Sequence, residues 1–359
     1  MEGSVAGKTI RAFSVLGSIL EAYVREPGNS PGQEGPAGAI DRAVRESCGK
    51  NPWFTPDHIR YALAAWAAVL KEEKLENWLA PYRIRAGVSA PSLTIGVVMA
   101  GNIPLAGFHD FLCVLASGHR FAGRLSSQDE LLLPCLSGIL TAAEPSLGPK
   151  ITFTSGKMPA FDAMIATGSN HTSRYFEYYF RKYPHIIRKN RNGVAVLTGE
   201  ETSREMDALG DDLFLYFGRG CRSVSKIYLP AGYGPERLKE FFSRYAEYAN
   251  HHKYRNNYDY YKSVFLVNRD PFEDTGFLLI RQERRIASPV SVLFYETYED
   301  RAELFRKLEE LSAEIQCIVC RDAAPFRGCR PGTSQQPGLS DYADGVDTME
   351  FLSGLSGKN

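Results

Sequence analysis

The chain has 359 residues, of which 44% are hydrophobic and 23% are charged, a composition typical of globular domains with enough apolar residues for two cores. It carries 42 basic and 42 acidic residues, so its formal net charge is zero and no overall positive field favours a nucleic-acid partner. Seven cysteines, an odd number, argue against a secreted disulfide framework and favour a reducing cytoplasm. No apolar run reaches the ~18 residues of a membrane span.

The N-terminal quarter is predicted to be helical. The first 28 residues indicate an amphipathic helix, and residues 27–37, rich in Pro, Gly and Ser, indicate a loop. Residues 55–82 show helical spacing of apolar side chains, with Thr55 as the cap and a proline in the first turn. We therefore predict a helical N-terminal region over residues 1–90.

Strands and helices then alternate. A strand at 94–100, a turn at 101–104, a helix at 105–118 and a strand at 120–126 form a βαβ unit. The same alternation continues with a helix at 128–142, strands at 150–155 and 162–169, a helix at 170–183 and a strand at 193–199. This pattern predicts a doubly wound α/β domain over residues 91–199, Rossmann-like, with ligands at the carboxyl ends of its strands.

A second α/β block is predicted over residues 200–330. Its elements are a helix at 202–217, a strand at 225–230, a helix at 234–249, a tyrosine-rich segment at 254–267, a strand at 289–296, a helix at 299–314 and a strand at 315–320. Residues 331–359 form a loop-rich tail that ends in a short apolar run.

Cys221 lies in the turn of 218-GRGCRSVSKIYLP-230, between a helix and a strand. Arg219 and Arg222 would favour its thiolate, and two glycines let a substrate approach the backbone, so one interpretation is a nucleophile. The other is a small apolar side chain in a loop. The stretch also nearly matches the dinucleotide fingerprint, but it follows a helix instead of a strand, which excludes that function.

Polar residues follow several predicted strands of the first α/β block. Asn102 is either a turn residue or an amide donor to an oxyanion. Arg124, Ser126 and Ser127 lie at the end of one predicted strand, and Thr167, Gly168 and Ser169 lie at the end of another; these groups either cap the next helix or bind a phosphate. His109 is interpreted as a packed or capping histidine. The C-x-x-C of Cys317 and Cys320 lies in an apolar strand, so no metal site is predicted.

Taken in order, several segments resemble the aldehyde dehydrogenase superfamily, and more closely its acyl-CoA reductase branch, the family of the fatty acid reductase subunit of bacterial bioluminescence. The matching segments are 98-VMAGNIPLAGFHDFLCVLASGH-119, 125-LSS-127, 166-ATGSNHTSRYFEYYF-180, 185-HIIRKNRNGVAVLTG-199, 216-YFGRGCRSVSKIYLP-230, 288-SPVSVLFYE-296 and 341-DYADGVDTMEFL-352. The resemblance implies a Rossmann-like cofactor domain and a catalytic domain.

The resemblance also implies roles for individual residues. Cys221 matches the catalytic cysteine and Asn102 the oxyanion-hole asparagine. Cofactor contacts are implied for Arg124, which stands where many relatives have a lysine, and for the segments Ser126–Ser127 and Thr167–Gly168–Ser169. The implied cofactor is NADPH, with NADH as the alternative, and coenzyme A is part of the substrate.

Two positions depart from the superfamily pattern. Aldehyde-oxidising members carry a glutamate that activates water, whereas this chain reads 189-KNRNGVAV-196. Arg285 stands where a ribose-binding glutamate is expected. The first departure suits an acyl thioester that exchanges with coenzyme A instead of water.

The resemblance therefore implies reduction of an acyl-CoA to an aldehyde through an acylated cysteine. The alternatives are an aldehyde dehydrogenase that makes a free acid, and a non-catalytic scaffold subunit of an acyl-transferring complex. Expected partners are the acyl-CoA, a second copy of the chain paired through residues 345–359, or an acyl-transferring protein.

Overall fold

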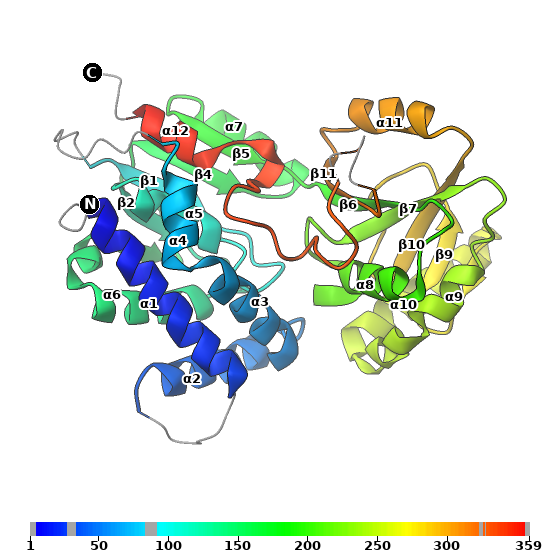
Figure 1. The fold of residues 1–359 in the computed structure, drawn as a ribbon, viewed down its shortest axis with the longest axis horizontal. Helices are drawn as coiled ribbons and strands as arrows, with labels where there is room; N and C mark the ends of the chain where they lie inside the picture. The colour runs from blue at the N-terminus through cyan, green and yellow to red at the C-terminus, as the bar shows by residue number, and fades with distance from the viewer. Residues whose placement is uncertain (1–4, 27–33, 83–91, 323–325, 327, 356–359) are drawn as a thin grey trace. The chain divides into compact units, whose positions relative to one another are not determined.

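The computed structural model describes residues 5–26, 34–82, 92–322, 326 and 328–355. The chain divides into two compact units, which are described separately here: residues 1–189 with 338–359, and residues 190–337 (Figure 1). The prediction of a chain with two α/β domains is confirmed, and the first sheet is parallel while the second is parallel except for one edge strand.

The first unit is built on a parallel sheet with the strand order β3-β2-β1-β4-β5. Its strands are β1 (Thr94–Val98), β2 (Arg120–Arg124), β3 (Ile151–Thr154), β4 (Ala163–Thr167) and β5 (His185–Arg188). From β1 the chain continues to β2, which pairs with one edge of β1, whereas β4 pairs with the opposite edge of β1. The strand order therefore reverses between β1 and β4, the position where doubly wound sheets bind nucleotides.

Helices of the first unit pack into a core with this sheet. They are α1 (Val5–Arg25), α2 (Pro36–Lys50), α3 (Pro56–Val69), α4 (Glu72–Leu79), α5 (Phe108–Ala116), α6 (Leu132–Ala143), the 3-10 turn η1 (Pro145–Lys150), α7 (Asn170–Phe180), the 3-10 turn η4 (Ala343–Gly345) and α12 (Thr348–Leu355). Phe13 of α1 makes edge-to-face contacts with Phe108 and Phe111 of α5. The N-terminal region is helical as predicted, but its helices share the core of the first α/β unit.

The second unit contains a six-stranded sheet with the order β11-β6-β7-β10-β9-β8, parallel except for β8. Its elements are β6 (Asn192–Val196), α8 (Ser203–Phe214), the 3-10 turn η2 (Leu215–Gly218), β7 (Val224–Pro230), α9 (Arg237–Phe242), the 3-10 segment η3 (Ser243–Asn250), α10 (His252–Asn268), β8 (Glu273–Asp274), β9 (Leu279–Gln282), β10 (Val292–Tyr298), α11 (Arg301–Glu310) and β11 (Ile315–Cys320).

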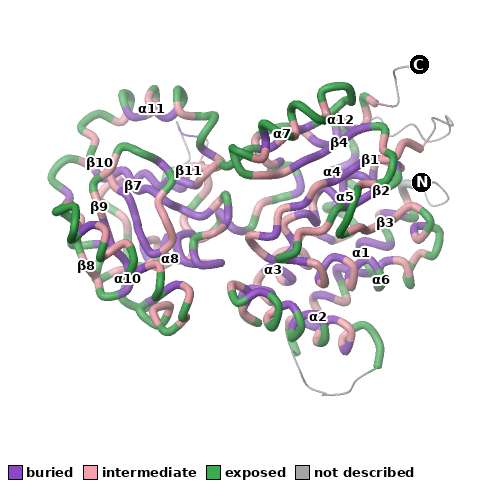
Figure 2. Tube along the Cα trace, turned by 180° about the vertical axis from the view of Figure 1, so that it is seen from behind, coloured by how far each residue is buried: buried purple, intermediate pink, exposed green. Residues whose placement is uncertain are grey.

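Residues 194–197, in β6 and directly after it, contribute alternately to hydrophobic cores on opposite faces of this second sheet. Ala195 and Leu197 pack with α8 and α9, whereas Val194 and Val196 pack with α11. Figure 1 shows α11 on one side of the sheet and α8 with α9 on the other. Figure 2 shows β7 buried along its length, while α11 has exposed residues on its outer side. Successive side chains of a strand point to opposite faces of the sheet, and both faces of this sheet are covered. This burial on both faces explains why the strands are continuously apolar in sequence.

Three sequence-based boundaries are corrected. The strand expected at 193–199 was assigned to the cofactor domain, but β6 pairs with β7 and β11 in the second sheet, so that domain ends near Lys189. The helix expected at 55–82 breaks between α3 and α4, because Leu70 leaves helical geometry. The strand expected at 289–296 begins only at Val292, after the turn that Pro289 forms.

The tail expected at 331–359 is also divided. Residues 338–355 return to the first unit, where Met349 and Leu352 of α12 are fully buried. His119 on the approach to β2 hydrogen bonds to the carbonyl of Leu352 at 3.1 Å. These apolar side chains are therefore used within the chain, and pairing of two copies through residues 345–359 would need other side chains.

Candidate active site

Three neighbouring strands of the first sheet end beside the predicted cofactor residues. Val98 of β1 is in register with Arg124 of β2 and with Ala166 of β4, so the three carboxyl ends lie at one edge of the sheet. Asn102 follows β1, Ser126 and Ser127 follow β2, and Thr167 ends β4. The sheet therefore gathers these sequence-predicted positions at the point where its strand order reverses.

The turn that carries Asn102 is held by close packing and by one buried carboxylate. Leu105 has a φ of 60°, and its backbone N–H donates to Oδ2 of Asp129 at 2.8 Å. A Cβ at Gly101 would lie 2.3 Å from Oγ of Ser126, so only glycine allows this approach. Burial raises the pKa of Asp129 to about 6. Asn102 itself is half-buried.

The serines after β2 do not cap a helix. Oγ of Ser126 accepts a hydrogen bond from the backbone N–H of Gln128 at 3.3 Å. The carbonyl of Ser126 accepts one from the backbone N–H of Asp129 at 2.9 Å. Helix α6 begins later, with Leu131 as its cap residue. Ser127 and Arg124 are exposed at the strand end, where they can contact a ligand.

Ser169, by contrast, is the N-cap of α7. Its Oγ accepts a hydrogen bond from the backbone of Thr172 at 3.1 Å, as the capping interpretation expects. The same position puts the N-terminus of an 11-residue helix beside the end of β4. The backbone N–H groups of such a terminus attract anions, so phosphate binding remains a prediction for Thr167, Gly168 and Ser169.

Cys221 lies in a tight turn after an unusual backbone segment. Tyr216, Phe217 and Gly218 have φ values of 56°, 57° and 69°, although aromatic residues rarely adopt this left-handed conformation. Both aromatic side chains are buried, whereas Cys221 is exposed and is not in a disulfide. Each such residue costs about 1–3 kcal/mol, and strain of this kind clusters at active sites.

The turn is closed by Ser223, which the sequence analysis did not single out. The backbone of Gly220 donates to Oγ of Ser223 at 3.2 Å, and the backbone of Ser223 donates to the carbonyl of Gly220 at 3.0 Å. Nε2 of Gln335 donates to the same hydroxyl at 3.3 Å. Ser223 directly precedes β7 and is 2% exposed, and this burial, which the sequence does not reveal, makes its hydroxyl part of the turn.

Asp212 of α8 fixes the loop that carries Gln335. Its two carboxylate oxygens accept hydrogen bonds from the backbone of Gly332 at 2.6 Å and of Ser334 at 2.9 Å, and from the Ser334 hydroxyl at 2.7 Å. Asp212 is 1% exposed, and this burial raises its pKa to about 6. The support of the Cys221 turn thus extends from α8 through residues 332–335.

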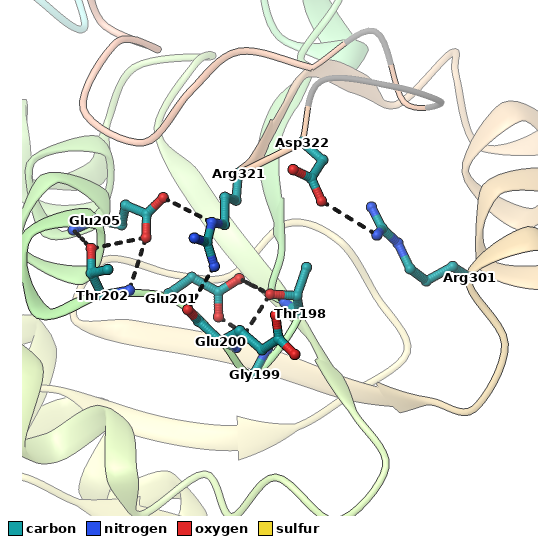
Figure 3. Close-up of polar contacts among 9 residues, drawn as sticks. All are labelled: Thr198, Gly199, Glu200, Glu201, Thr202, Glu205, Arg301, Arg321 and Asp322. Carbon is teal, nitrogen blue, oxygen red and sulfur yellow. Dashed lines mark hydrogen bonds and ion pairs between the residues drawn. The ribbon is translucent and has the colours of Figure 1, made fainter.

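Carboxylates near the end of β6 form the next turn and helix cap (Figure 3). Glu201 accepts hydrogen bonds from the backbone and hydroxyl of Thr198, at 2.6 and 2.8 Å, and from the backbone of Gly199 at 3.0 Å. Glu205 completes a capping box with Thr202 and pairs with Arg321 at 3.2 Å. The hydrogen bonds from Thr202 lower the pKa of Glu205, which makes this carboxylate a poor base.

Other sequence-predicted residues have structural contacts. His109 hydrogen bonds to the carbonyl of Leu339 at 3.0 Å and stacks on Trp66, as a packed histidine does. The thiols of Cys317 and Cys320 donate to different carbonyls, because residues three apart on a strand face opposite sides. Arg285 pairs with Glu283 at 2.9 Å.

Within residues 5–26, 34–82, 92–322, 326 and 328–355, no group of three or more His, Cys, Asp or Glu side chains could hold a metal ion. No helix in the same part of the chain is long and apolar enough to cross a membrane.

A small cavity of about 30 Å³ lies within the second unit, between residues 213–218, the start of β7 and residues 288–293. Its lining includes Phe214, Phe217, Gly218 and Tyr254. A larger pocket of about 410 Å³ lies between the C-terminal half of α10 and the segment around Arg285 and Pro289. Cys221 lines neither of these two cavities; the smaller one borders Gly218 and Val224, which lie on either side of the Cys221 turn.

The fold is that of aldehyde dehydrogenases, as comparison with solved structures shows. The chain matches aldehyde dehydrogenase 21 from Physcomitrella patens, solved with the reaction product succinate, with a TM-score of 0.65 and 12% identity over 97% of this chain and 84% of that one. It also matches an NAD-dependent benzaldehyde dehydrogenase from Corynebacterium glutamicum, with a TM-score of 0.64 and 13% identity over 91% and 78% of the two chains.

A third match is the NAD⁺ complex of an aldehyde dehydrogenase from Bacillus cereus, with a TM-score of 0.57 and 11% identity over 91% and 74%. No protein-family model matches the sequence, and no curated protein matches it. At these identities the comparisons establish the fold, and the activity has to be inferred from the residues of this chain.

Proposed function

We propose that the chain is an oxidoreductase of the aldehyde dehydrogenase superfamily, in its acyl-CoA reductase branch, and that it reduces an acyl-CoA thioester to an aldehyde. The single observation that carries the proposal is the exposed Cys221, held on a strained turn between a helix and a strand of an aldehyde dehydrogenase fold. NADPH is the proposed reductant, with NADH as the alternative.

The strand ends of the first unit fit a nicotinamide dinucleotide. Arg124 and Ser127 are exposed there, and the N-terminus of α7 offers backbone N–H groups beside Gly168 and Ser169. Glycine at position 101 lets the chain after β1 pass close to the side chain of Ser126. These groups would hold phosphates and ribose hydroxyls. When bound, the reduced nicotinamide supplies a hydride.

Cys221 and Asn102 carry the remaining steps. The Cys221 thiolate attacks the thioester carbonyl, and the resemblance to acyl-CoA reductases assigns the stabilisation of the oxyanion to the amide of Asn102 and the backbone N–H of Cys221. Coenzyme A then leaves as the thiol, and the acyl group remains on Cys221 as a thioester. After reduction Cys221 holds a thiohemiacetal, whose collapse releases the aldehyde and regenerates the thiolate.

The carboxylates after β6 support acyl exchange with coenzyme A over hydrolysis. Val196, at the end of the strand, is fully buried, and the carboxylates of Glu201 and Glu205 accept hydrogen bonds inside their own turn and cap. A carboxylate already engaged in this way is a weak activator of water. A long-lived acyl-enzyme is therefore expected.

Acylation of the protein by a long-chain acyl-CoA tests the assignment. Intact mass measurement should show one acyl group on the wild type and none on Cys221→Ala, whereas Cys135→Ala, a matched thiol variant in α6, should be acylated normally. An acyl group found on Cys221→Ala would refute the assignment of Cys221 as the nucleophile. Retained binding of an acyl-transferring partner without any acylation would favour the scaffold alternative.

Oxidation of aldehydes to free acids is the second candidate. It is favoured by the NAD⁺ bound to one structural neighbour and the acid product bound to another. Cofactor turnover with acyl-CoAs of several lengths, measured with both nicotinamides, should exceed aldehyde-dependent NAD(P)⁺ reduction in the absence of coenzyme A. The opposite ranking would support the dehydrogenase.

A further inference from the structure

The larger pocket of the second unit, with a volume of about 410 Å³, has the size and lining of a ligand site. One wall is the C-terminal half of α10, with Val264 and Phe265. The opposite wall includes Ala287, Pro289 and Phe294. Sites for small organic ligands usually measure about 300–1,000 Å³ and are mostly apolar, with a few polar groups that fix the orientation of the ligand. This pocket therefore suits one small organic molecule.

Two arginines supply positive charge at the pocket. The guanidinium of Arg281 pairs with Asp270 at 2.8 Å and lies 4.8 Å from the centre of the Phe265 ring, which fixes its position. The guanidinium of Arg285 lies 5.6 Å from the centre of the Phe294 ring, and the Arg285 side chain is 72% exposed. Arg285 is therefore within reach of a ligand that enters from solvent.

Arg285 can exchange its present partner for a ligand at little cost. It donates to Oε2 of Glu283 at 2.9 Å, and an ion pair with so exposed a member contributes little to stability. Oε1 of Glu283 keeps two other donors, the backbone N–H groups of Arg284 at 2.9 Å and of Arg285 at 3.3 Å. A guanidinium forms paired hydrogen bonds to a phosphate, so phosphate is the group that this arginine fits best.

Side chains of β7 hold the segment that carries Arg285. Nζ of Lys226 donates to the carbonyl of Arg284 at 2.8 Å. Oγ of Ser225 donates to the carbonyl of Ile286, also at 2.8 Å. Both donors are buried, and Lys226 is fully so. The two carbonyls belong to the residues before and after Arg285, so the backbone of this arginine is fixed on both sides.

The same segment connects the pocket to the surroundings of Cys221. The small cavity of the second unit is lined by Gly218 and Val224, on either side of the Cys221 turn, and by Pro289. Pro289 also lines the larger pocket. The larger pocket is thus separated by one residue from a cavity that borders the turn of the proposed nucleophile.

We propose that the larger pocket binds the phosphorylated adenosine of coenzyme A, with the 3′-phosphate on the guanidinium of Arg285. The inference rests on the proposed function, in which an acyl-CoA thioester reaches Cys221. Coenzyme A carries its thiol at one end of a flexible arm and the phosphorylated adenosine at the other. A nucleophile and a phosphate site in one unit match these two ends, whereas the residues predicted to hold the nicotinamide dinucleotide belong to the first unit.

The pocket also has a place for the base. Tyr261 is half-buried in its lining, and an aromatic ring of this kind contacts a nucleotide base by stacking. Asn268 in the same lining offers an amide that can donate to and accept from the polar edge of the adenine.

Calorimetric binding of coenzyme A to the full chain tests the proposal without any acyl transfer. The wild type should bind coenzyme A at least about tenfold more tightly than dephospho-coenzyme A, which lacks the 3′-phosphate, because hydrogen bonds between charged groups are strong. Arg285→Gln should bind the two molecules equally, at the weaker affinity. Arg255→Gln is the matched control, since this arginine of α10 forms an exposed pair with Asp259 at 3.0 Å, and it should keep the wild-type difference.

Two kinetic comparisons identify the phosphate that Arg285 binds. The rate of Cys221 acylation is measured with an acyl-CoA and with the acyl-pantetheine of the same chain, which lacks the nucleotide. The preference for the acyl-CoA should be smaller in Arg285→Gln than in the wild type. The ratio of the KM values for NADPH and NADH should be the same in both proteins, because the dinucleotide phosphate is expected in the first unit.

Two results would overturn the proposal. One is an Arg285→Gln variant that distinguishes coenzyme A from dephospho-coenzyme A as strongly as the wild type. The other is a changed NADPH to NADH ratio with an unchanged preference for coenzyme A, which would assign Arg285 to the dinucleotide. A wild type that binds coenzyme A but is acylated by neither thioester would refute the proposed function, and the calorimetric comparison would still report on Arg285.

Discussion

Asp129 accepts the backbone N–H of Leu105 at 2.8 Å, and Leu105 is in a left-handed conformation with a φ of 60°. One buried carboxylate therefore stabilises the strained end of the turn that begins at Asn102. This makes Asp129 a positioning residue for the proposed oxyanion donor.

Replacement of Asp129 by alanine should loosen this turn. An unpaired buried N–H costs about 1–3 kcal/mol, so the free energy of unfolding should fall by a similar amount. The kcat of acyl-CoA reduction should fall more than the fraction of Cys221 that can be acylated, since the nucleophile lies in the other unit. Asp129→Asn keeps an acceptor oxygen and should recover most of the loss; equal loss in both variants would contradict a positioning role.

Asn102→Ala should lower turnover by roughly a hundredfold or more, because one oxyanion donor is worth about 3 kcal/mol in the transition state. The rate of coenzyme A release in a single turnover measures the effect directly. Asn257→Ala removes an amide that donates to the carbonyl of Lys253 within α10 and should leave this rate unchanged. An unchanged rate in Asn102→Ala would remove this residue from the mechanism.

Asp212 should make stability depend on pH. Its pKa is about 6 in the folded protein, against 3.8 for an ordinary aspartate, so between these values the folded state holds a proton that the unfolded state has lost. The free energy of unfolding should therefore fall as the pH rises from about 4 to 6, by at most ~3 kcal/mol for this group.

Urea unfolding at a series of pH values measures this slope. Asp212→Asn should reduce the slope without abolishing it, because Asp129 titrates in the same range. Asp57→Asn, at an 86% exposed side chain, should keep the slope of the wild type. A slope unaffected by Asp212→Asn would mean that its carboxylate is charged throughout.

The buried ion pair of Asp110 and Arg188 should be essential for stability. The guanidinium donates to both carboxylate oxygens, at 2.5 and 2.9 Å, and both side chains are under 10% exposed. Asp110→Ala leaves a buried charge without its counterion and should cost about 3–5 kcal/mol. Asp259→Ala, which removes an exposed pair with Arg255, should cost less than about 1 kcal/mol in the same unfolding measurement.

The alternation of elements could be predicted from the sequence because apolar periodicity is local. β1, β2, β4, β7 and β11 were all expected within a few residues of their observed bounds. The sheet to which β6 belongs could not be predicted in the same way. Its apolar run has the same pattern as the neighbouring strands, and its pairing with β11 joins segments more than 100 residues apart. The strands β5 and β9 were not expected, because their four residues lack the alternation of apolar and polar side chains that β3, of the same length, shows at Ile151–Thr154.

The predicted site residues were likewise those that stand at strand ends or turns, where sequence position alone locates them. The groups that hold them were missed. Asp129 was expected inside a helix at 128–142, and the left-handed Tyr216 and Phe217 contradict the preferences of aromatic residues. Such strain depends on tertiary packing, so no local pattern predicts it.

The second unit is one continuous stretch of chain, residues 190–337, set into the first. Within the first unit, the residues before this stretch are hydrogen bonded to residues that follow it. Arg188 donates to Thr348 at 2.9 Å, and the backbone of Lys189 donates to Asp344 at 3.4 Å. An insertion whose ends are anchored in this way can vary without altering any strand of its host. The part of the chain that carries Cys221 is thus a single insertion, whose sequence can change while the five-stranded sheet of the first unit stays as it is.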